Sequence, residues 1–255
     1  MLAAYTLWLR EVVRFLRQRS RIVGALGSRL VFWFLIGSGL NRSFQGGPAM
    51  PLQGGYLEYF YPGTLALILL FTAIFSTISI VEDRQEGFLQ GVLVAPVPRS
   101  AIVVGKVLGS TTLAVIQGGV FLLLAPFAHV QFHLAAVPAI LGVMVVVAFG
   151  LSGLGFLVAW WLDSTQGFHA IMNVFLIPLW ILSGALFPAS GAAGWVRALM
   201  LANPLTYGVS ALRRLFYDQP LAGEPSFALS LAVTLMFAAA MAAAGTIAVS
   251  RKKAG

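Results

Sequence analysis

Two histidines have the spacing of a metal-binding pair. His129 and His133 lie four positions apart in the stretch AHVQFH, so a helical turn would bring both imidazoles to the same face. A zinc site needs further ligands, and neither a carboxylate nor a third histidine lies near this pair in the sequence. We therefore predict no metal site.

Nucleotide chemistry is not expected in this chain either. Gly105 and Lys106 form the Gly-Lys pair that ends a phosphate-binding loop, but the loop requires Ser or Thr at the next position, where this chain has Val107. The spacing of Gly105 and Gly109 is instead typical of a small-residue surface on which another helix packs. We predict that the chain binds no cofactor and is not an enzyme.

The composition indicates an integral membrane protein. The chain has 255 residues, of which 59% are hydrophobic and 9% charged, whereas soluble domains have about 25% charged residues. The mean hydropathy is +0.91. The net charge of +8 does not indicate nucleic-acid binding, because the basic residues gather at the ends of apolar runs, where they act as topology signals and contact lipid headgroups.

Six apolar runs are long enough to cross a bilayer as helices. They predict an all-α protein with spans at 22–40, 60–81, 105–127, 135–162, 168–189 and 227–249. An even number of spans places both termini on one side. An ion-coupled secondary carrier is one class of transporter that such spans could form. Carriers of this class need acidic or His relays inside the spans, and these runs contain almost none.

Basic residues predict the orientation of these spans. The side that carries both termini has five arginines between Arg10 and Arg21, then Arg84, Arg99 and Lys106, then the run from Arg251 to Lys253; the other side has Arg42, Arg197, Arg213 and Arg214. This bias predicts that both termini are cytoplasmic. On the outer side, the run YLEYFYP at 56–62 is expected to form an aromatic belt.

Residues 1–21 are expected to form an amphipathic helix. Arg10, Arg14, Arg17 and Arg21 fall on one face, opposite aromatic and aliphatic residues, which is typical of a helix that lies in the membrane interface. The alternative is a basic leader without fixed structure.

The stretch VEDRQEGFLQGVLVAPVPRS at 81–100 is acidic and apolar at once. Its apolar residues have helical spacing, so we predict a short helix over 85–95, with acidic residues at its start, where the helix dipole favours them, and with Pro96 at its end. The apolar stripe could occupy a groove of another protein, or it could pack on headgroups or on the neighbouring spans. The pattern leaves these alternatives open.

A few polar residues interrupt the spans and their connections. Arg29 lies a turn or two from the inner end of the first span, so it could either contact substrate or a second subunit, or extend its charge to the interface. Asp163 and Gln166 are expected to cap the helix of the fifth span. The segment 190–226 is expected to form short outer helices, in which Arg213 and Arg214 contact headgroups or, as the alternative, an anionic substrate.

The stretch EDRQEGFLQGVLVAPVPRSAIVVGK, with ANPLTYGVSALRR at 202–214 and LSGALFP at 182–188, resembles type-two ABC exporter permeases, especially the nodulation-type and daunorubicin-type export permeases. The resemblance implies a bacterial inner-membrane subunit of a single domain, 1–255, which forms a homodimer. A separate ABC ATPase would bind ATP and Mg and power the export of a lipid, glycolipid, polysaccharide or hydrophobic drug.

The resemblance also assigns roles to residues. The helix over 85–95 becomes a coupling helix that contacts the ATPase through Glu82, Glu86, Gly87, Phe88, Leu89, Val92, Leu93, Pro96 and Arg99. Spans one, two and five would line the dimer interface and the translocation path, with Arg29, Asn173 and Pro178 as candidate residues. Asn203, Pro204 and Tyr207 would belong to an outer gate.

Overall fold

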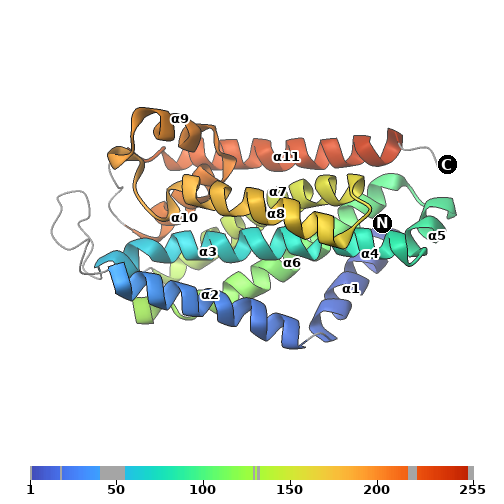
Figure 1. The fold of residues 1–255 in the computed structure, drawn as a ribbon, viewed down its shortest axis with the longest axis horizontal. Coiled ribbons are helices and arrows are strands. Elements are labelled where there is room, and N and C mark those ends of the chain that lie inside the picture. The colour runs from blue at the N-terminus through green and yellow to red at the C-terminus, as the bar shows by residue number, and fades with distance from the viewer. Residues whose placement is uncertain are drawn as a thin grey trace.

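The computed structural model describes residues 2–17, 19–40, 55–128, 130, 133–217 and 223–251. The chain forms an elongated bundle in which the long helices run side by side along one axis (Figure 1). Within the described residues every regular element is helical, which confirms the predicted all-α class.

The long helices of the bundle, which correspond to the expected spans, are α2 (Arg19–Leu40), α3 (Gly55–Ser76), α6 (Arg99–Leu122), α7 (Val137–Trp161), α8 (Thr165–Trp180) and α11 (Phe227–Arg251). Among the described residues, five stretches are long and apolar enough to cross a membrane: Gly55–Gln85, Arg99–Leu122, Leu134–Trp161, Thr165–Ala185 and Phe227–Arg251. In α2 the apolar stretch is shorter, Gly27–Leu40. The chain is therefore a multi-pass membrane protein.

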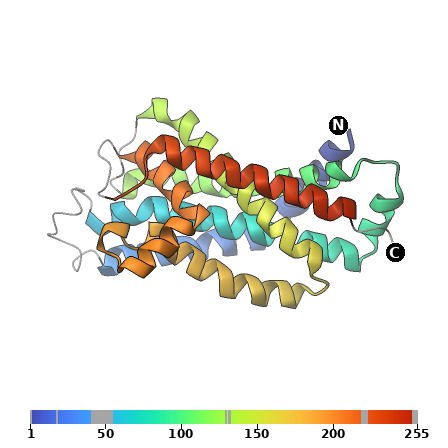
Figure 2. The same ribbon diagram turned by 90° about the horizontal axis from the view of Figure 1, so that it is seen from above.

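The shorter elements gather at the two ends. One end, called the α5 end below, contains α1 (Leu2–Arg17), α4 (Ser79–Gln85), α5 (Phe88–Val94) and the last turn of α11 (Figure 1). The other end, called the α10 end, contains α9 (Gly194–Ala202), α10 (Pro204–Phe216) and the short helical turns Ala125–Ala128, Leu134–Ala136 and Ala189–Gly191. Figure 2, seen from above, places the first residues of α1 and the end of α11 at the same end of the bundle.

Helix α3 is the centre of the bundle. Apart from Glu58 it has no charged residue, and nearly all of its side chains are buried by α2, α6, α7, α8 and α10, as expected for a helix that is apolar on every face. The resemblance implied that span two lines the dimer interface and the translocation path. The chain's own helices enclose most of α3, and its place along the interface and the path stays a prediction.

The tyrosines at the start of α3 do not form the expected aromatic belt. Tyr56, Tyr59 and Tyr61 are fully buried. Their hydroxyls donate hydrogen bonds of 2.9, 2.8 and 2.8 Å to the carbonyls of Leu186, Gly184 and Phe121. The prediction was wrong because composition does not distinguish a lipid-facing tyrosine from one whose hydroxyl is satisfied by a neighbouring helix.

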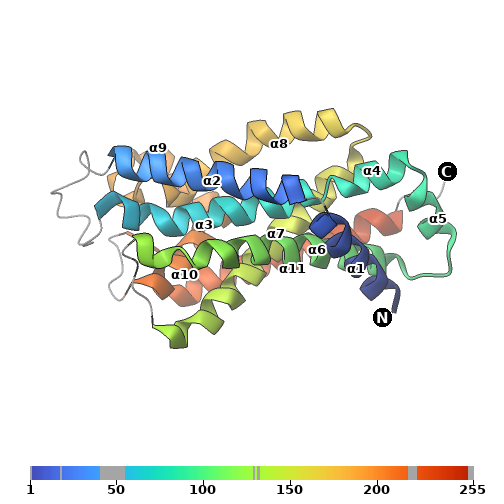
Figure 3. The same ribbon diagram turned by 90° about the horizontal axis from the view of Figure 1, so that it is seen from below.

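Helix α1 lies obliquely across α6, as Figure 3 shows from below. The contact depends on two glycines of α6: a Cβ atom on Gly105 would lie 2.7 Å from the side chain of Leu7, and one on Gly109 would lie 2.7 Å from that of Glu11. These glycines therefore form the small-residue packing surface that their spacing predicts, and α1 is the helix that occupies it.

Candidate functional site

The α5 end contains a cluster of seven charged side chains, three cations and four anions, called the ion network below. Its members are Arg10, Glu11 and Arg14 of α1, Glu82 and Asp83 of α4, Glu86 at the C-terminal end of α4, and Lys106 of α6. Ser79 of α4 donates a hydrogen bond of 2.7 Å to Glu11. The network thus joins elements that are far apart in the sequence.

Lys106 is the buried cation at the centre of the ion network. Its side chain is 2% exposed, its Nζ lies 2.7 Å from Glu11 Oε1, and it pairs with the fully buried Asp83. Arg10 completes the pairing of Asp83 with two hydrogen bonds of 2.7 and 2.9 Å, a bidentate geometry typical of strong Arg–carboxylate pairs. Hydrogen bonding to Asp83 raises the pKa of Arg10 above its ordinary value.

The short helix α5 begins later than the sequence predicts. Gly87 has φ of +78°, a left-handed conformation that ends the preceding turn and separates α4 from α5. Glu82 and Asp83 therefore belong to α4, where they bind arginines of α1, and the first turn of α5 contains no acidic residue. The expected role of these acids at the start of the coupling helix is corrected. Glu86 ends α4 and is exposed.

The apolar stripe of α5 is divided between the bundle and the surface. Leu89 is buried, Val92 and Leu93 are half-buried, and Phe88 is 37% exposed. The guanidinium of Arg10 lies 3.9 Å from the centre of the Phe88 ring, which connects α5 to the ion network. A groove of about 440 Å³ runs between α5 and the start of α1; its lining includes Ala3, Leu7, Phe88, Gly91 and Val92.

Two further arginines at this end bind the C-termini of long helices. Arg84 donates hydrogen bonds of 2.6 and 2.9 Å to the carbonyls of Trp160 and Leu162, at the end of α7. Arg99 donates bonds of 3.0 and 3.1 Å to the carbonyls of Val249 and Ser250, in the last turn of α11. Both satisfy carbonyls that a helix end leaves without partners. Pro96 lies exposed in the connection between α5 and α6.

The predicted cap of the fifth span is displaced by one residue. Ser164, not Asp163, caps α8, and its hydroxyl accepts a hydrogen bond of 3.2 Å from the backbone N–H of Gly167. Asp163 instead pairs with Arg84 at 2.8 Å.

At the α10 end, α8 unwinds into a π-helical turn, Ile181–Ala185, in which Gly184 has φ of +79°. The turn frees backbone carbonyls, and side chains bind several of them. The side-chain amide of Asn203 donates a hydrogen bond of 2.6 Å to the carbonyl of Leu179, and its oxygen caps α10 by accepting a hydrogen bond from the N–H of Leu205. Pro204 begins α10, and the Tyr207 hydroxyl donates 2.9 Å to Leu201. The three residues expected at an outer gate therefore hold α9, α10 and the unwound turn together.

Arg213 is buried beneath this turn, so its expected contact with headgroups is wrong. Its side chain is 3% exposed, pairs with Glu224, and donates a hydrogen bond of 3.1 Å to Gly184. The guanidinium also lies 4.4 Å from the ring centre of Tyr59. Burial disfavours the charge of Arg213, but Tyr59 and Glu224 outweigh that effect, and the pKa of Arg213 is raised.

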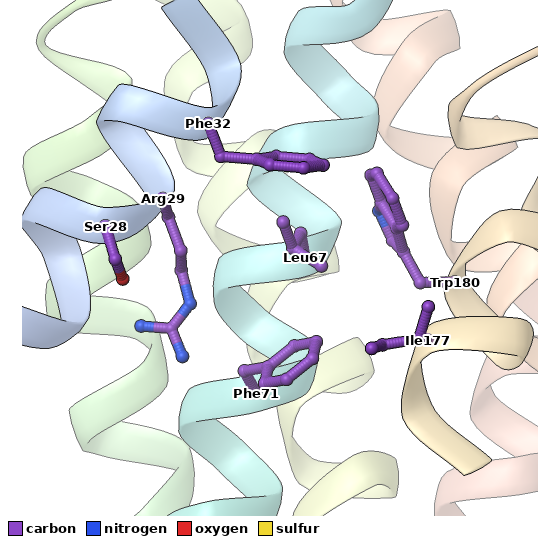
Figure 4. A pocket seen from close by; sticks show the side chains of 7 residues that line it. All are labelled: Ser28, Arg29, Phe32, Leu67, Phe71, Ile177 and Trp180. Atoms are coloured by element: carbon purple, nitrogen blue, oxygen red, sulfur yellow. The ribbon is translucent and has the colours of Figure 1, made fainter. Parts of the chain in front are cut away.

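The three candidate residues for the path or dimer interface do not form one cluster. Asn173 and Pro178 lie on the exposed side of α8, beside the exposed Val174 and Phe175. Arg29 lines a pocket of about 310 Å³ between α2, α3 and α8 (Figure 4). The side chains around this pocket are Ser28, Arg29, Phe32, Leu67, Phe71, Ile177 and Trp180.

Some predictions fall on parts of the chain that the structure does not describe. These are His129, Arg42, Lys252 and Lys253, and the side chains of Arg19 and Arg21. Among the described residues, no group of three or more His, Cys, Asp or Glu side chains could hold a metal ion.

The long apolar helices of the bundle define a multi-pass membrane protein. The sequence profile described as "ABC-2 type transporter" matches residues 3–217. The chain therefore belongs to the ABC-2 type transporter family, which confirms the resemblance seen in the sequence. This family consists of permease subunits, generally non-catalytic, that normally work with an ABC ATPase.

Three curated proteins illustrate the similarity. A putative transport permease, ycf38, of Cyanophora paradoxa is 28% identical over 65% of this chain and 58% of its own length. A probable multidrug ABC transporter permease, YbhR, of Escherichia coli K12 is 23% identical over 63% of this chain and 44% of its own length. Nodulation protein J of Sinorhizobium fredii is 23% identical over 85% of this chain and 79% of its own length. The chain thus spans less than two thirds of the first two relatives.

Proposed function

We propose that this chain is the permease subunit of a bacterial ABC exporter, and that a separate ATPase subunit docks on its α5 end. Family membership supports an ATPase partner. The single observation that carries the docking site is the exposed side of α5, where Phe88 lines the groove against α1 and Val94 is 80% exposed. Such a short apolar helix beside a groove fits helix-in-groove recognition between proteins.

The contacts at the α5 end suggest how movement of the docked ATPase would reach the membrane spans. A displacement of α5 would act on Arg10 through Phe88, and on Asp83 and Lys106 through Arg10. Because α1 packs directly on the glycines of α6, the same displacement would shift α6. In this proposal the ATPase binds ATP and Mg, and the permease contributes the moving helices.

The proposed arrangement in the membrane places the α5 end in the cytoplasm. That end carries most of the basic residues that the structure describes, in agreement with the positive-inside rule. Two copies of the chain would pair through the exposed apolar sides of α2 and α8, which include Phe34, Leu35, Val174 and Phe175. The proposed cargo class is lipid, glycolipid, polysaccharide or hydrophobic drug, moved outward across the inner membrane.

The test of this proposal is co-purification with the ATPase subunit from membranes that contain both proteins. We expect Phe88→Asp to reduce recovery of the ATPase about tenfold or more, as for a central interface aromatic. The matched control is Trp195→Asp, which places the same charge on a 71% exposed aromatic residue of α9, at the opposite end. Equal recovery with Phe88→Asp and with the wild type would refute docking on α5.

A further inference from the structure

The exposed side of α8 is partly polar, although this helix belongs to a candidate membrane span. Gln166, His169 and Asn173 are all exposed and follow one another at spacings of three and four residues, so they form one stripe along the helix, called the polar stripe below. Figure 3 places α8 at the edge of the bundle, and α8 packs mainly on α3 and on the π-helical turn that follows it. The polar stripe therefore has few partners among the described residues of the chain.

Helix α11 shows the side chains that this chain presents to lipid. Between Ala228 and Ile247, every exposed side chain of α11 is apolar, whereas its polar residues Ser230 and Thr234 are buried. Lipid tails offer no hydrogen bonds, so a polar side chain on a span is expected to face protein or water. The contrast with α11 indicates that the polar stripe of α8 does not face lipid.

Asn173 lies deepest in the polar stripe. It follows the first residue of the span Thr165–Ala185 by eight positions, which corresponds to about 12 Å of helix. Its side-chain amide forms no hydrogen bond with any residue that the structure describes. Pro178, also exposed, has no N–H, so the carbonyl of Val174 beside this amide lacks its usual helical partner. An amide left unpaired in hydrocarbon is costly, so we expect a partner from outside the chain.

The partner that fits the polar stripe is the same stripe on a second copy of the chain. A side-chain amide has both donors and an acceptor, so two Asn173 side chains that meet at a two-fold axis can satisfy each other. In such a symmetric contact, a residue near the axis lies against its own copy. Ala170, exposed one turn before Asn173, is small enough to let two helix backbones approach closely. Ile171 and Val174, 37% and 69% exposed, supply apolar packing around the pair.

We infer that α8 pairs with α8 of a second copy, and that the two Asn173 amides hydrogen-bond to each other across the two-fold axis. His169 and Gln166 continue the contact toward the α5 end. This inference rests on the proposed function, in which two copies of the chain pair, and it names the polar contact at the centre of their interface.

The test is disulfide crosslinking in membranes, because the chain contains no cysteine. Asn173→Cys places a thiol at the expected axis, where two Cα atoms can reach the separation of about 4.4–6.8 Å that a disulfide needs. We expect a disulfide-linked permease dimer after oxidation with copper phenanthroline. Ala243→Cys is the matched control, because Ala243 is exposed on α11 and also lies eight positions from the α5 end of its helix; it should remain monomeric. Phe175→Cys, on another side of α8 and 66% exposed, should crosslink less.

A second measurement tests the hydrogen bonds themselves. Asn173→Leu keeps the size of the side chain but removes its donors and acceptor. We expect dimerisation in liposomes, followed by energy transfer between fluorescently labelled copies, to weaken about tenfold, the effect of two interhelical hydrogen bonds in a bilayer. Met236→Leu changes a 63% exposed residue of α11 and should leave dimerisation unchanged.

Equal crosslinking of Asn173→Cys and Ala243→Cys would overturn the inference, and so would unchanged dimerisation of Asn173→Leu. Labelling of Asn173→Cys by a membrane-impermeant thiol reagent, without a disulfide, would overturn it as well, because the polar stripe would then face a water-filled path. None of these measurements contains the ATPase. Their failure therefore leaves ATPase docking on α5 intact, and failure of co-purification leaves the α8 contact intact.

Discussion

The substitution Lys106→Met tests whether the ion network holds α1 against the bundle. Lys106 is 2% exposed and contacts two carboxylates that are themselves buried, Glu11 at 6% and Asp83 at 0% exposure. Removing one partner of a buried ion pair costs about 3–5 kcal/mol. Arg10 still pairs with Asp83, so we expect a value near the lower end, about 3 kcal/mol. For a chain of this size that lowers the Tm by roughly 6–12 °C.

The assay heats the purified chain in detergent and measures unfolding as the loss of the monodisperse peak in size-exclusion chromatography. Arg14→Gln is the control: Arg14 and Glu82 are each 29% exposed, and pairs near the surface contribute about 1 kcal/mol or less. Arg14 also contacts the buried Asp83 at 3.3 Å, but Arg10 and Lys106 still pair with Asp83 in this variant, so its loss should be smaller than that of Lys106→Met. The double variant Lys106→Met with Glu11→Met should recover at least half of the loss, since an apolar pair replaces a buried ionic one. A Tm within 1 °C of the wild type for Lys106→Met, or no recovery in the double variant, would refute the reasoning.

Three further substitutions test other contacts by the same thermal assay. Gly105→Val should lower the free energy of unfolding by about 1–3 kcal/mol through overpacking, because its Cβ would lie 2.7 and 2.9 Å from atoms of α1. Gly119 lies on the same helix but has open space around it, so Gly119→Val should unfold like the wild type. Arg213→Gln should cost about 3 kcal/mol, because a buried carboxylate loses its cation, and a Tm equal to that of the wild type would contradict the pairing. Ser164→Ala should cost about 1 kcal/mol as a lost helix cap, whereas an equal loss in Asp163→Ala would contradict the assignment of the cap to Ser164.

The sequence predicted those features that depend on neighbouring residues. Hydropathy located the long helices, and the spacing of Gly105 and Gly109 predicted a packing surface. The motif around Phe88 predicted the family. Local pattern did not predict where α5 begins, because the break depends on the left-handed conformation of Gly87 and not on a change in hydrophobic spacing.

The contacts of Lys106, Glu11 and Tyr59 were not predicted, because the partners of these side chains are remote in the sequence. Lys106 pairs with Glu11 from 95 positions away, and Tyr59 donates to Gly184 from 125 positions away. A single sequence shows only that such residues lie at the end of an apolar run, where lipid headgroups are the usual partner. A buried acid on one helix beside a basic residue of another, as in Glu11 with Lys106, becomes recognisable only once the packing of α1 on α6 is known.

Site-specific crosslinking shows directly whether the ATPase subunit binds the α5 end. The chain contains no cysteine, so Val94→Cys on α5 and Trp195→Cys on α9 each introduce one thiol at an exposed position. The thiol is labelled with benzophenone maleimide in membranes that contain the ATPase subunit and is then illuminated. We expect a permease–ATPase adduct from Val94→Cys and none from Trp195→Cys. An adduct from Trp195→Cys but none from Val94→Cys would show that the ATPase subunit does not dock on α5.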